Sequence, residues 1–162
     1  MDYINIPEDR VSVLIGPKGT TKRRIEKLGT SKLRISNNGN VSIEGENIIT
    51  KSIVEAIGRG FNPRTAMKLF NDEYSFEIIE LTEYSGSKNR LGVIRARVIG
   101  REGSVRKSIE VQTGVNLAIK GKTVSIIGKP EAVYLARRSL EMILAGSQHG
   151  SSFRWLKDQL SD

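Results

Sequence analysis

The sequence contains no cysteine and only one histidine, His149. The absence of cysteine excludes disulfide frameworks, thiolate metal sites and a cysteine nucleophile. A single histidine leaves no His pair for a metal ion and no ordinary Ser-His-Asp arrangement, unless His149 acts as a lone base. We therefore expect a chain that is not an enzyme and that uses neither a metal ion nor another cofactor.

Long apolar runs are also absent. The sequence has no stretch of about 18 apolar residues, and residues 1–5 lead directly into an expected strand rather than into a charged-then-apolar leader. Apolar residues make up 38% and charged residues 27%, which is typical of an ordered globular protein. We expect a cytoplasmic protein that does not contact membranes.

Positive charge is plentiful, with a formal net charge of +8 and a pI of about 9.9. This excess favours a polyanionic partner over an acidic small molecule. Charge alone fits a nucleic acid, an anionic membrane surface or simply a solvated basic surface, so the choice depends on motifs.

The chain contains an internal repeat. Residues 15–26 align with residues 99–110 through the leading Ile, both glycines and the closing Ile-Glu pair. Residues 33–35 then match 117–119, and residues 41–45 match 124–128 after a one-residue gap. Residues 1–72 and 73–146 each hold twelve Lys/Arg against eight Asp/Glu, so the basic character belongs to the repeats. We predict a first module with an extra linking helix over 1–72, a second module over 73–146 and a tail over 147–162.

Periodicity and turn residues predict the same order of elements in both modules. The first is expected to contain a strand (3–6), a helix (11–15), a loop (16–19) and a helix (20–28) that is capped by Thr20 or Thr21 and ended by Gly29. Two strands (33–36 and 41–44) joined at Asn38-Gly39 should follow, and then helices from 48 to 58 and from Asn62-Pro63 onward. The second is expected to contain a strand (74–81), helices (89–99 and 104–113) around the loop 100–103, strands (115–119 and 123–127) and a helix (130–144). The predicted fold class is α+β, with two three-stranded antiparallel sheets, each with helices on one face.

The tail is expected to be a linker over 146–151 followed by a short helix over 152–160. Phe153, Leu156 and Leu160 form a small apolar stripe on that helix, with Trp155 on a different side. This stripe fits packing on the tail's own module or docking of a partner helix.

The two GxxG loops are the candidate binding sites of the chain. Each follows an apolar helix ending in Ile and precedes a helix that opens with Thr or Ser and is rich in Lys and Arg. Glycines permit unusual backbone angles and remove Cβ atoms, so a nucleic-acid backbone can approach the main chain closely. The free N–H groups and positive dipole end of the following helix then face the phosphates. Neither loop contains an aromatic residue, so we expect bases to be recognised by aliphatic packing and hydrogen bonds.

This arrangement resembles the KH domain, in the strand-first topology called type I, over residues 2–60 and 74–145. The resemblance implies that each loop grips about four nucleotides of single-stranded RNA beside an apolar groove. The implied RNA-binding residues are Gly16, Pro17, Lys18, Gly19, Lys22, Arg23 and Arg34 in the first module and Gly100, Arg101, Glu102, Gly103, Arg106 and Lys107 in the second. The aliphatic residues implied near the groove, most of which must also build the core, are Val13, Ile15, Ile25, Ile35, Ile99, Ile109 and Leu117.

The two modules differ at positions that matter for binding. Arg34 is expected to read a base edge, whereas its counterpart Ala118 cannot do so by hydrogen bonding. Pro17 is unusual in the variable pair, and Glu102 places a carboxylate beside the expected phosphate path, surrounded by Arg95, Arg97 and Arg101. We therefore expect the second loop to bind more weakly than the first.

Residues 56–66 and 81–103 resemble one particular family, the archaeal two-KH ribosome-biogenesis proteins, which are relatives of the eukaryotic small-subunit factor called partner of Nob. This resemblance implies binding near the 3′ end of small-subunit ribosomal RNA and assistance to its maturation. The protein partners that it allows are a pre-rRNA nuclease or a translation initiation factor, and we expect a monomer.

Two alternatives remain open at this stage. One is a messenger or translation-linked RNA-binding protein, and the other is an RNA-processing enzyme with an unrecognised site. The second draws on scattered acids that lack a recognisable ligand pattern: Glu44, Glu46, Asp72, Glu73, Glu77 and Glu80. A phosphate-hydrolysing P-loop is rejected, because residues 16–22 lack the Gly-Lys-Ser/Thr order after a four-residue gap.

Overall fold

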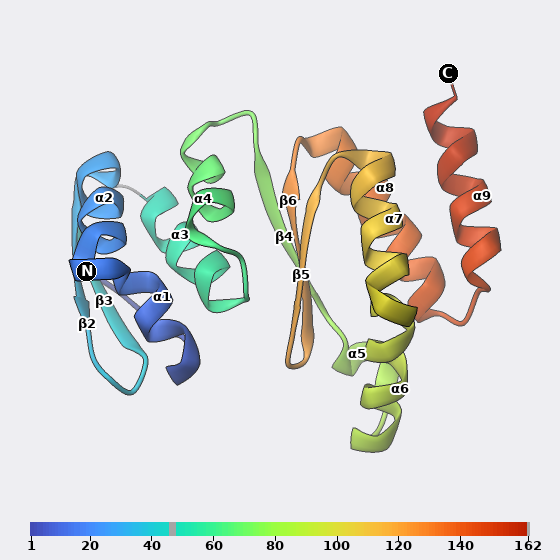
Figure 1. Ribbon diagram of the computed structural model, residues 1–162, viewed down its shortest axis with the longest axis horizontal. Helices are drawn as coiled ribbons and strands as arrows, with labels where there is room; N and C mark the ends of the chain where they lie inside the picture. Colours follow the sequence, from blue (N-terminus) through green and yellow to red (C-terminus); the bar gives the residue numbers. More distant parts are fainter. Residues whose placement is uncertain (46–47, 162) are drawn as a thin grey trace. The chain divides into compact units, whose positions relative to one another are not determined.

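The computed structural model describes residues 1–45 and 48–161. It divides the chain into two compact units, Met1–Tyr74 and Ser75–Asp162. Each unit contains one three-stranded antiparallel sheet with its helices packed on one face (Figure 1). The predicted α+β fold class, with a KH-like order of elements in both units, is confirmed.

In the first unit the sheet order is β1-β3-β2, so the last strand lies between the other two. Its elements are β1 (Asp2–Asn5), a 3-10 turn (Glu8–Arg10), α1 (Val11–Ile15), a 3-10 turn (Pro17–Gly19), α2 (Thr20–Gly29), β2 (Ser31–Ile35), β3 (Asn40–Gly45), α3 (Ile48–Gly58), α4 (Pro63–Ala66) and a 3-10 turn (Met67–Phe70). Leu33 and Ile43 are cross-strand partners on the buried face, and Arg34 and Ser42 are partners on the opposite face.

The ends of α2 differ from the prediction. No threonine side chain caps its start: the N-cap is Gly19 in the left-handed region, and the Thr20 hydroxyl instead donates to the Pro17 carbonyl at 2.7 Å. At the other end Gly29 is still helical, and Thr30 takes the left-handed position with φ 48°. A Cβ on Gly29 would lie 2.1 Å from Thr50 Oγ1, so this glycine serves the close packing of α2 against α3.

Two predicted turn signals are confirmed. Gly39 has φ 94° in the connection between β2 and β3, as the Asn38-Gly39 pair indicated. The Asn62 side chain accepts a hydrogen bond from the Thr65 N–H at 2.9 Å and so caps α4, with Pro63 in the first helical turn.

The second unit repeats this plan with the sheet order β4-β6-β5. Its elements are β4 (Ser75–Glu80), α5 (Thr82–Ser85), α6 (Lys88–Ile99), a 3-10 turn (Arg101–Gly103), α7 (Ser104–Thr113), β5 (Asn116–Lys120), β6 (Thr123–Gly128), α8 (Pro130–Leu144) and α9 (His149–Leu160). The helical turn α5 was not predicted, because four residues are too few to show a period. Within residues 1–45 and 48–161, no helix is long and apolar enough to cross a membrane.

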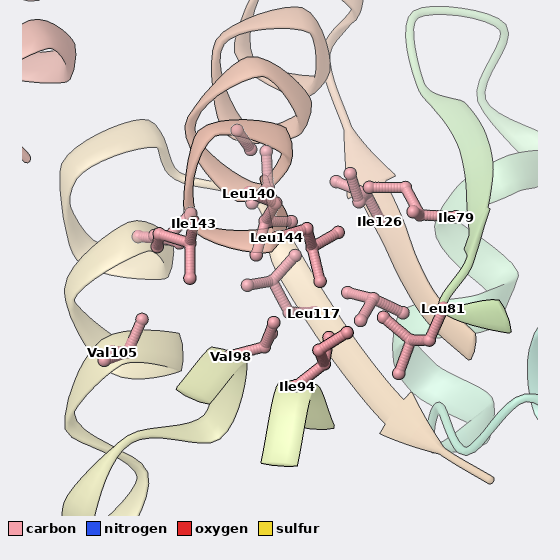
Figure 2. Packing of buried hydrophobic residues seen from close by; sticks show 14 of the residues in the cluster. Ile79, Leu81, Ile94, Val98, Val105, Leu117, Ile126, Leu140, Ile143 and Leu144 are labelled. Atoms are coloured by element: carbon pink, nitrogen blue, oxygen red, sulfur yellow. The ribbon is translucent and has the colours of Figure 1, made fainter. Parts of the chain in front are cut away.

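The core of the second unit lies between its sheet and the helices α6, α7 and α8. Figure 2 shows aliphatic side chains from all of these elements converging on one another, including Ile79, Leu81, Ile94, Val98, Val105, Leu117, Ile126, Leu140, Ile143 and Leu144. Val98 lies in the last turn of α6, before the GxxG loop, and Val105 lies in the first turn of α7, after it, so the core anchors the loop on both sides.

The terminal helix α9 packs on its own unit. Leu156 is fully buried, and Phe153 lies against the core of the second unit. Ser152 on α9 is buried and its hydroxyl donates to the Ser139 carbonyl of α8 at 2.9 Å. Two of the three residues in the apolar stripe, Phe153 and Leu156, thus pack on their own module, whereas Leu160 is 43% exposed. The helix begins at His149, three residues earlier than predicted.

Candidate nucleic-acid interface

The two GxxG loops have nearly the same backbone conformation. Gly16 and Gly100 have φ/ψ of 75°/174° and 76°/170°, and Gly19 and Gly103 have 75°/14° and 76°/17°. The third loop residue is left-handed in both, with φ 53° at Lys18 and 56° at Glu102. A non-glycine residue in this region is uncommon, so the shared geometry is a specific feature of both loops.

The first glycine of each loop is required for packing as well as for its backbone angles. A Cβ on Gly16 would lie 2.2 Å from Thr21 Oγ1, and a Cβ on Gly100 would lie 2.5 Å from Val105 Cγ2. The side chain at the second position of the following helix therefore occupies the space that any larger loop residue would need. The loop is held tightly against the helix start by this contact.

The second glycine of each loop lies beneath a basic side chain. A Cβ on Gly19 would lie 2.9 Å from Arg23 Nη1. A Cβ on Gly103 would lie 3.8 Å from Lys107 Cε. Both cations come from the fourth position of the following helix, α2 or α7. Each loop thus combines an open backbone, the positive end of a helix dipole and a cation over its second glycine, which suits a phosphate group.

The predicted RNA-binding cations in and just after the two loops fall into two groups. Lys22 Nζ lies 3.3 Å from Glu26 Oε2, and Arg106 Nε lies 3.9 Å from Glu110 Oε1, so both side chains lean along their helices toward a carboxylate. The other four cations, Lys18, Arg23, Arg101 and Lys107, are exposed. No ion pair joins these four to another residue within 1–45 and 48–161, so they are the better candidates for phosphate contact.

The prediction that Arg97 helps to surround Glu102 is wrong. Its guanidinium donates to the Ile143 carbonyl at 3.0 Å and to the Ser147 carbonyl at 2.7 Å, at the end of α8. Arg10 does the same in the first unit, where it donates to the Ile57 and Phe61 carbonyls at the end of α3. In each unit an arginine thus donates to a carbonyl in the last turn of a helix and to a second carbonyl just beyond it, where the negative end of the helix dipole favours a cation.

The aliphatic residues assigned to the groove divide between core and surface. Ile25 and Ile109 are fully buried and Leu117 is 4% exposed, so these three build the core. Val13, Ile15, Ile35 and Ile99 are half-buried and remain candidates for base contact. Periodicity could not separate the two groups because both lie on the apolar side of their elements.

Arg34 lies on the outer face of the first sheet, away from the helical layer. It borders a hollow of about 620 Å³ whose lining also includes Tyr3 and Ser42, its neighbours in the cross-strand row. Leu33 faces the core instead, and Ile35 follows it on the helical side. Residues 16–19, 22 and 23 thus lie together at the start of α2, whereas Arg34 lies on the outer face of the first sheet, beside a hollow that Ile35 also lines.

A second hollow of about 340 Å³ lies beside the first loop, between α2 and α4. Its lining includes Arg24 and Arg64, neither of which was predicted to take part in binding. The sequence gives little signal for either one, since Arg24 follows two other basic residues and Arg64 stands outside the repeat.

Acidic residues do not form a metal site in the described part of the chain. Within residues 1–45 and 48–161, no group of three or more His, Cys, Asp or Glu side chains is arranged to hold a metal ion. Glu46, one of the acids considered for an RNA-processing enzyme, lies outside the described residues.

Comparisons with known proteins agree with the fold. Residues 75–160 match the family model of the second KH domain of PNO1, described as a eukaryotic type KH domain, type I. A KH domain-containing protein of Methanocaldococcus jannaschii is 42% identical over 97% of this chain and 73% of its own length.

Solved structures match over nearly the whole chain. A chain in the crystal structure of an a/eIF2alpha–aDim2p–rRNA complex from Pyrococcus horikoshii is 39% identical with a TM-score of 0.90, covering 99% of this chain and 94% of that one. Dim2p from the same organism is 40% identical with a TM-score of 0.87, covering 97% and 98%. A protein of unknown function from Aeropyrum pernix is 27% identical with a TM-score of 0.91, covering 98% and 89%. The chain therefore belongs to the PNO1-type family of KH-domain proteins, in the type I topology.

Proposed function

We propose that this chain binds single-stranded RNA through its two GxxG loops and that its natural RNA is the 3′ region of small-subunit ribosomal RNA during ribosome biogenesis. The observation that carries the proposal is the pair of loops with matching backbone angles, each placed at the start of a basic helix. Such a loop grips the backbone of about four nucleotides in a KH domain.

Similarity over the whole chain supports the choice of RNA. The Pyrococcus horikoshii structure with a TM-score of 0.90 contains rRNA together with aDim2p and a/eIF2alpha. We extend the rRNA partner to this chain, and we also propose a protein partner of the same kind, a translation initiation factor or a pre-rRNA nuclease that acts on the bound strand.

The proposed role is binding rather than catalysis. The RNA is held by backbone N–H groups, exposed cations and aliphatic contacts, none of which cleaves a phosphodiester. We assign the protein to the cytoplasm, where ribosomal subunits mature, and expect a monomer whose two units contact one strand.

Individual contacts follow from the geometry. We assign backbone contacts to residues 16–19 and 100–103, and phosphate contacts first to Lys18, Arg23, Arg101 and Lys107. Lys22 and Arg106 contribute less because each would have to leave a carboxylate. Arg34 contributes only if the strand reaches the outer face of the first sheet.

Fluorescence anisotropy tests the proposal. The protein is titrated into a labelled single strand from the 3′ end of its host's small-subunit rRNA, a scrambled strand and a duplex. We expect preference for the native strand and weak binding to the duplex. Equal binding to the native and scrambled strands would contradict the assignment of rRNA as the natural ligand. Preference for the duplex would contradict binding of single-stranded RNA by the GxxG loops.

A further inference from the structure

We propose that the first unit contains an additional phosphate-binding pocket, formed by Arg24 and Arg64, which holds a phosphodiester of the RNA strand beyond the nucleotides gripped by the GxxG loop. The pocket has a volume of about 340 Å³ and lies between α2 and α4. Its lining comprises Thr20, Thr21, Arg24, Pro63, Arg64 and Met67. This inference rests on the proposed RNA-binding function and extends it outside the KH motif.

The chemistry of the lining favours an anion. Two guanidinium groups from different elements border one hollow, and no carboxylate is among the lining residues. No hydrogen bond or ion pair joins either guanidinium to another residue in the described ranges 1–45 and 48–161. Arginine suits a phosphate because its planar fork can donate two parallel hydrogen bonds to phosphate oxygens.

The pocket is continuous with the first GxxG loop. Thr20 lines the pocket and its hydroxyl donates to the Pro17 carbonyl in the loop at 2.7 Å. Thr21 also lines the pocket, and its Oγ1 packs against Gly16 closely enough to exclude a Cβ there. A strand whose phosphate lies at the loop therefore has its neighbouring phosphates close to Arg24 and Arg64.

Two of the residues that line this pocket have no similar residue at the matching positions of the second unit. In the alignment of the repeats, Val105 and Ser108 stand where the first unit has Thr21 and Arg24. The other wall is built by α4, which begins after the repeated segment and is held in place by the Asn62 cap. The pocket thus lengthens the RNA footprint of the first unit alone and distinguishes it from the second.

Salt-dependent anisotropy on the full-length protein tests this pocket. The double variant R24Q/R64Q is compared with R138Q/R154Q, which removes the same two charges from α8 and α9 in the second unit. With a strand of eight or more nucleotides we expect R24Q/R64Q to bind roughly tenfold more weakly, the size of a charged hydrogen bond. Its slope of log affinity against log salt should be shallower by about 0.7, the value for one phosphate on a single strand.

Two further arms separate a structural effect from a binding effect. Thermal unfolding of R24Q/R64Q should match that of the wild-type protein, and R24K/R64K should recover the salt slope while regaining only part of the affinity, since lysine keeps the charge but not the fork. A titration of the wild-type protein with inorganic phosphate, followed by backbone NMR shifts at residues 20–24 and 63–67, tests whether a small anion is the real ligand.

The outcomes are distinguishable. If R24Q/R64Q and R138Q/R154Q bind RNA with the same affinity and slope, the pocket does not hold a strand phosphate. Saturable shifts with inorganic phosphate in the absence of any RNA effect would assign the pocket to a free anion instead. If the wild-type protein itself binds no single-stranded RNA, the proposed function fails and the pocket inference fails with it.

Discussion

The carboxylate of Glu110 accepts a hydrogen bond from the backbone N–H of Leu117 at 2.9 Å, and so ties helix α7 to the edge strand β5. The same relationship recurs in the first unit, where Glu26 accepts from the Leu33 N–H at 2.8 Å. These glutamates close the repeated motif in the sequence. They hold the helix after each GxxG loop against the strand that follows it.

Loss of this carboxylate is expected to destabilise the second unit. In E110A the Leu117 N–H, in a half-buried setting, loses a charged acceptor, which should cost about 1.5–3 kcal/mol of unfolding free energy. E110Q keeps a neutral acceptor and should lose less. Urea unfolding measures both, with E131Q, on the exposed first turn of α8, as a control. Equal stability of E110A and E131Q would show that the hydrogen bond does not contribute.

Acidic substitutions in the first loop should weaken RNA binding without unfolding the protein. P17D/K18D replaces an exposed cation by carboxylates on the phosphate path, and aspartate tolerates the left-handed angle of Lys18. We expect at least a tenfold loss of affinity, or about 1.4 kcal/mol, with an unchanged melting temperature. Unchanged affinity in anisotropy would remove the first loop from the interface. The parallel variant R101D/E102D then measures how much the second loop contributes to RNA affinity.

Reversing the charge of Glu102 should strengthen the second loop. E102K places lysine where the first loop has Lys18, at nearly the same φ, and removes a carboxylate from the phosphate path. We expect affinity to rise about three- to tenfold at low salt, with a salt slope steeper by about 0.7 for one added phosphate contact. E131K carries the same charge change far from the loop in the sequence and serves as the control. An equal gain in E131K would assign the effect to net charge alone.

The two glycines of the second loop should differ in their tolerance of alanine. In G100A the new Cβ would meet Val105 Cγ2 at 2.5 Å, and the residue would also keep φ 76° and ψ 170°, a region nearly restricted to glycine. In G103A the nearest contact is Lys107 Cε at 3.8 Å, and the cost is that of a left-handed alanine, about 1 kcal/mol. We expect G100A to lose at least about 2 kcal/mol in urea unfolding, with a smaller loss in G103A. The reverse order would contradict the assigned roles.

Much of the fold could be predicted from local sequence. The Asn38-Gly39 turn and the Asn62 cap depend on near neighbours in the chain and are found where expected, and the order of strands and helices is as predicted apart from the helical turn α5. The internal repeat also located both GxxG loops, because glycine spacing and the following basic helix are properties of a short continuous segment.

Other features were decided by contacts between distant segments. Periodicity could not tell that Ile25 and Ile109 are sealed in the core while Ile15 and Ile99 remain half-exposed, since all four lie on apolar faces. Gly29 looked like a helix stop, but its lack of a side chain serves contact with Thr50, which is far along the chain.

The sequence by itself determined that this protein is a tandem repeat with two GxxG loops, because backbone conformation in tight turns is set by the residues in them. Only the tertiary structure decided which charges are available to a ligand. In the folded chain Lys22 and Arg106 are paired with carboxylates, and Arg97 donates a hydrogen bond to a helix carbonyl. Arg24 and Arg64 line one hollow. The reason is physical: whether a charge is satisfied depends on what lies within a few ångströms of it, and folding alone decides which parts of the chain meet there.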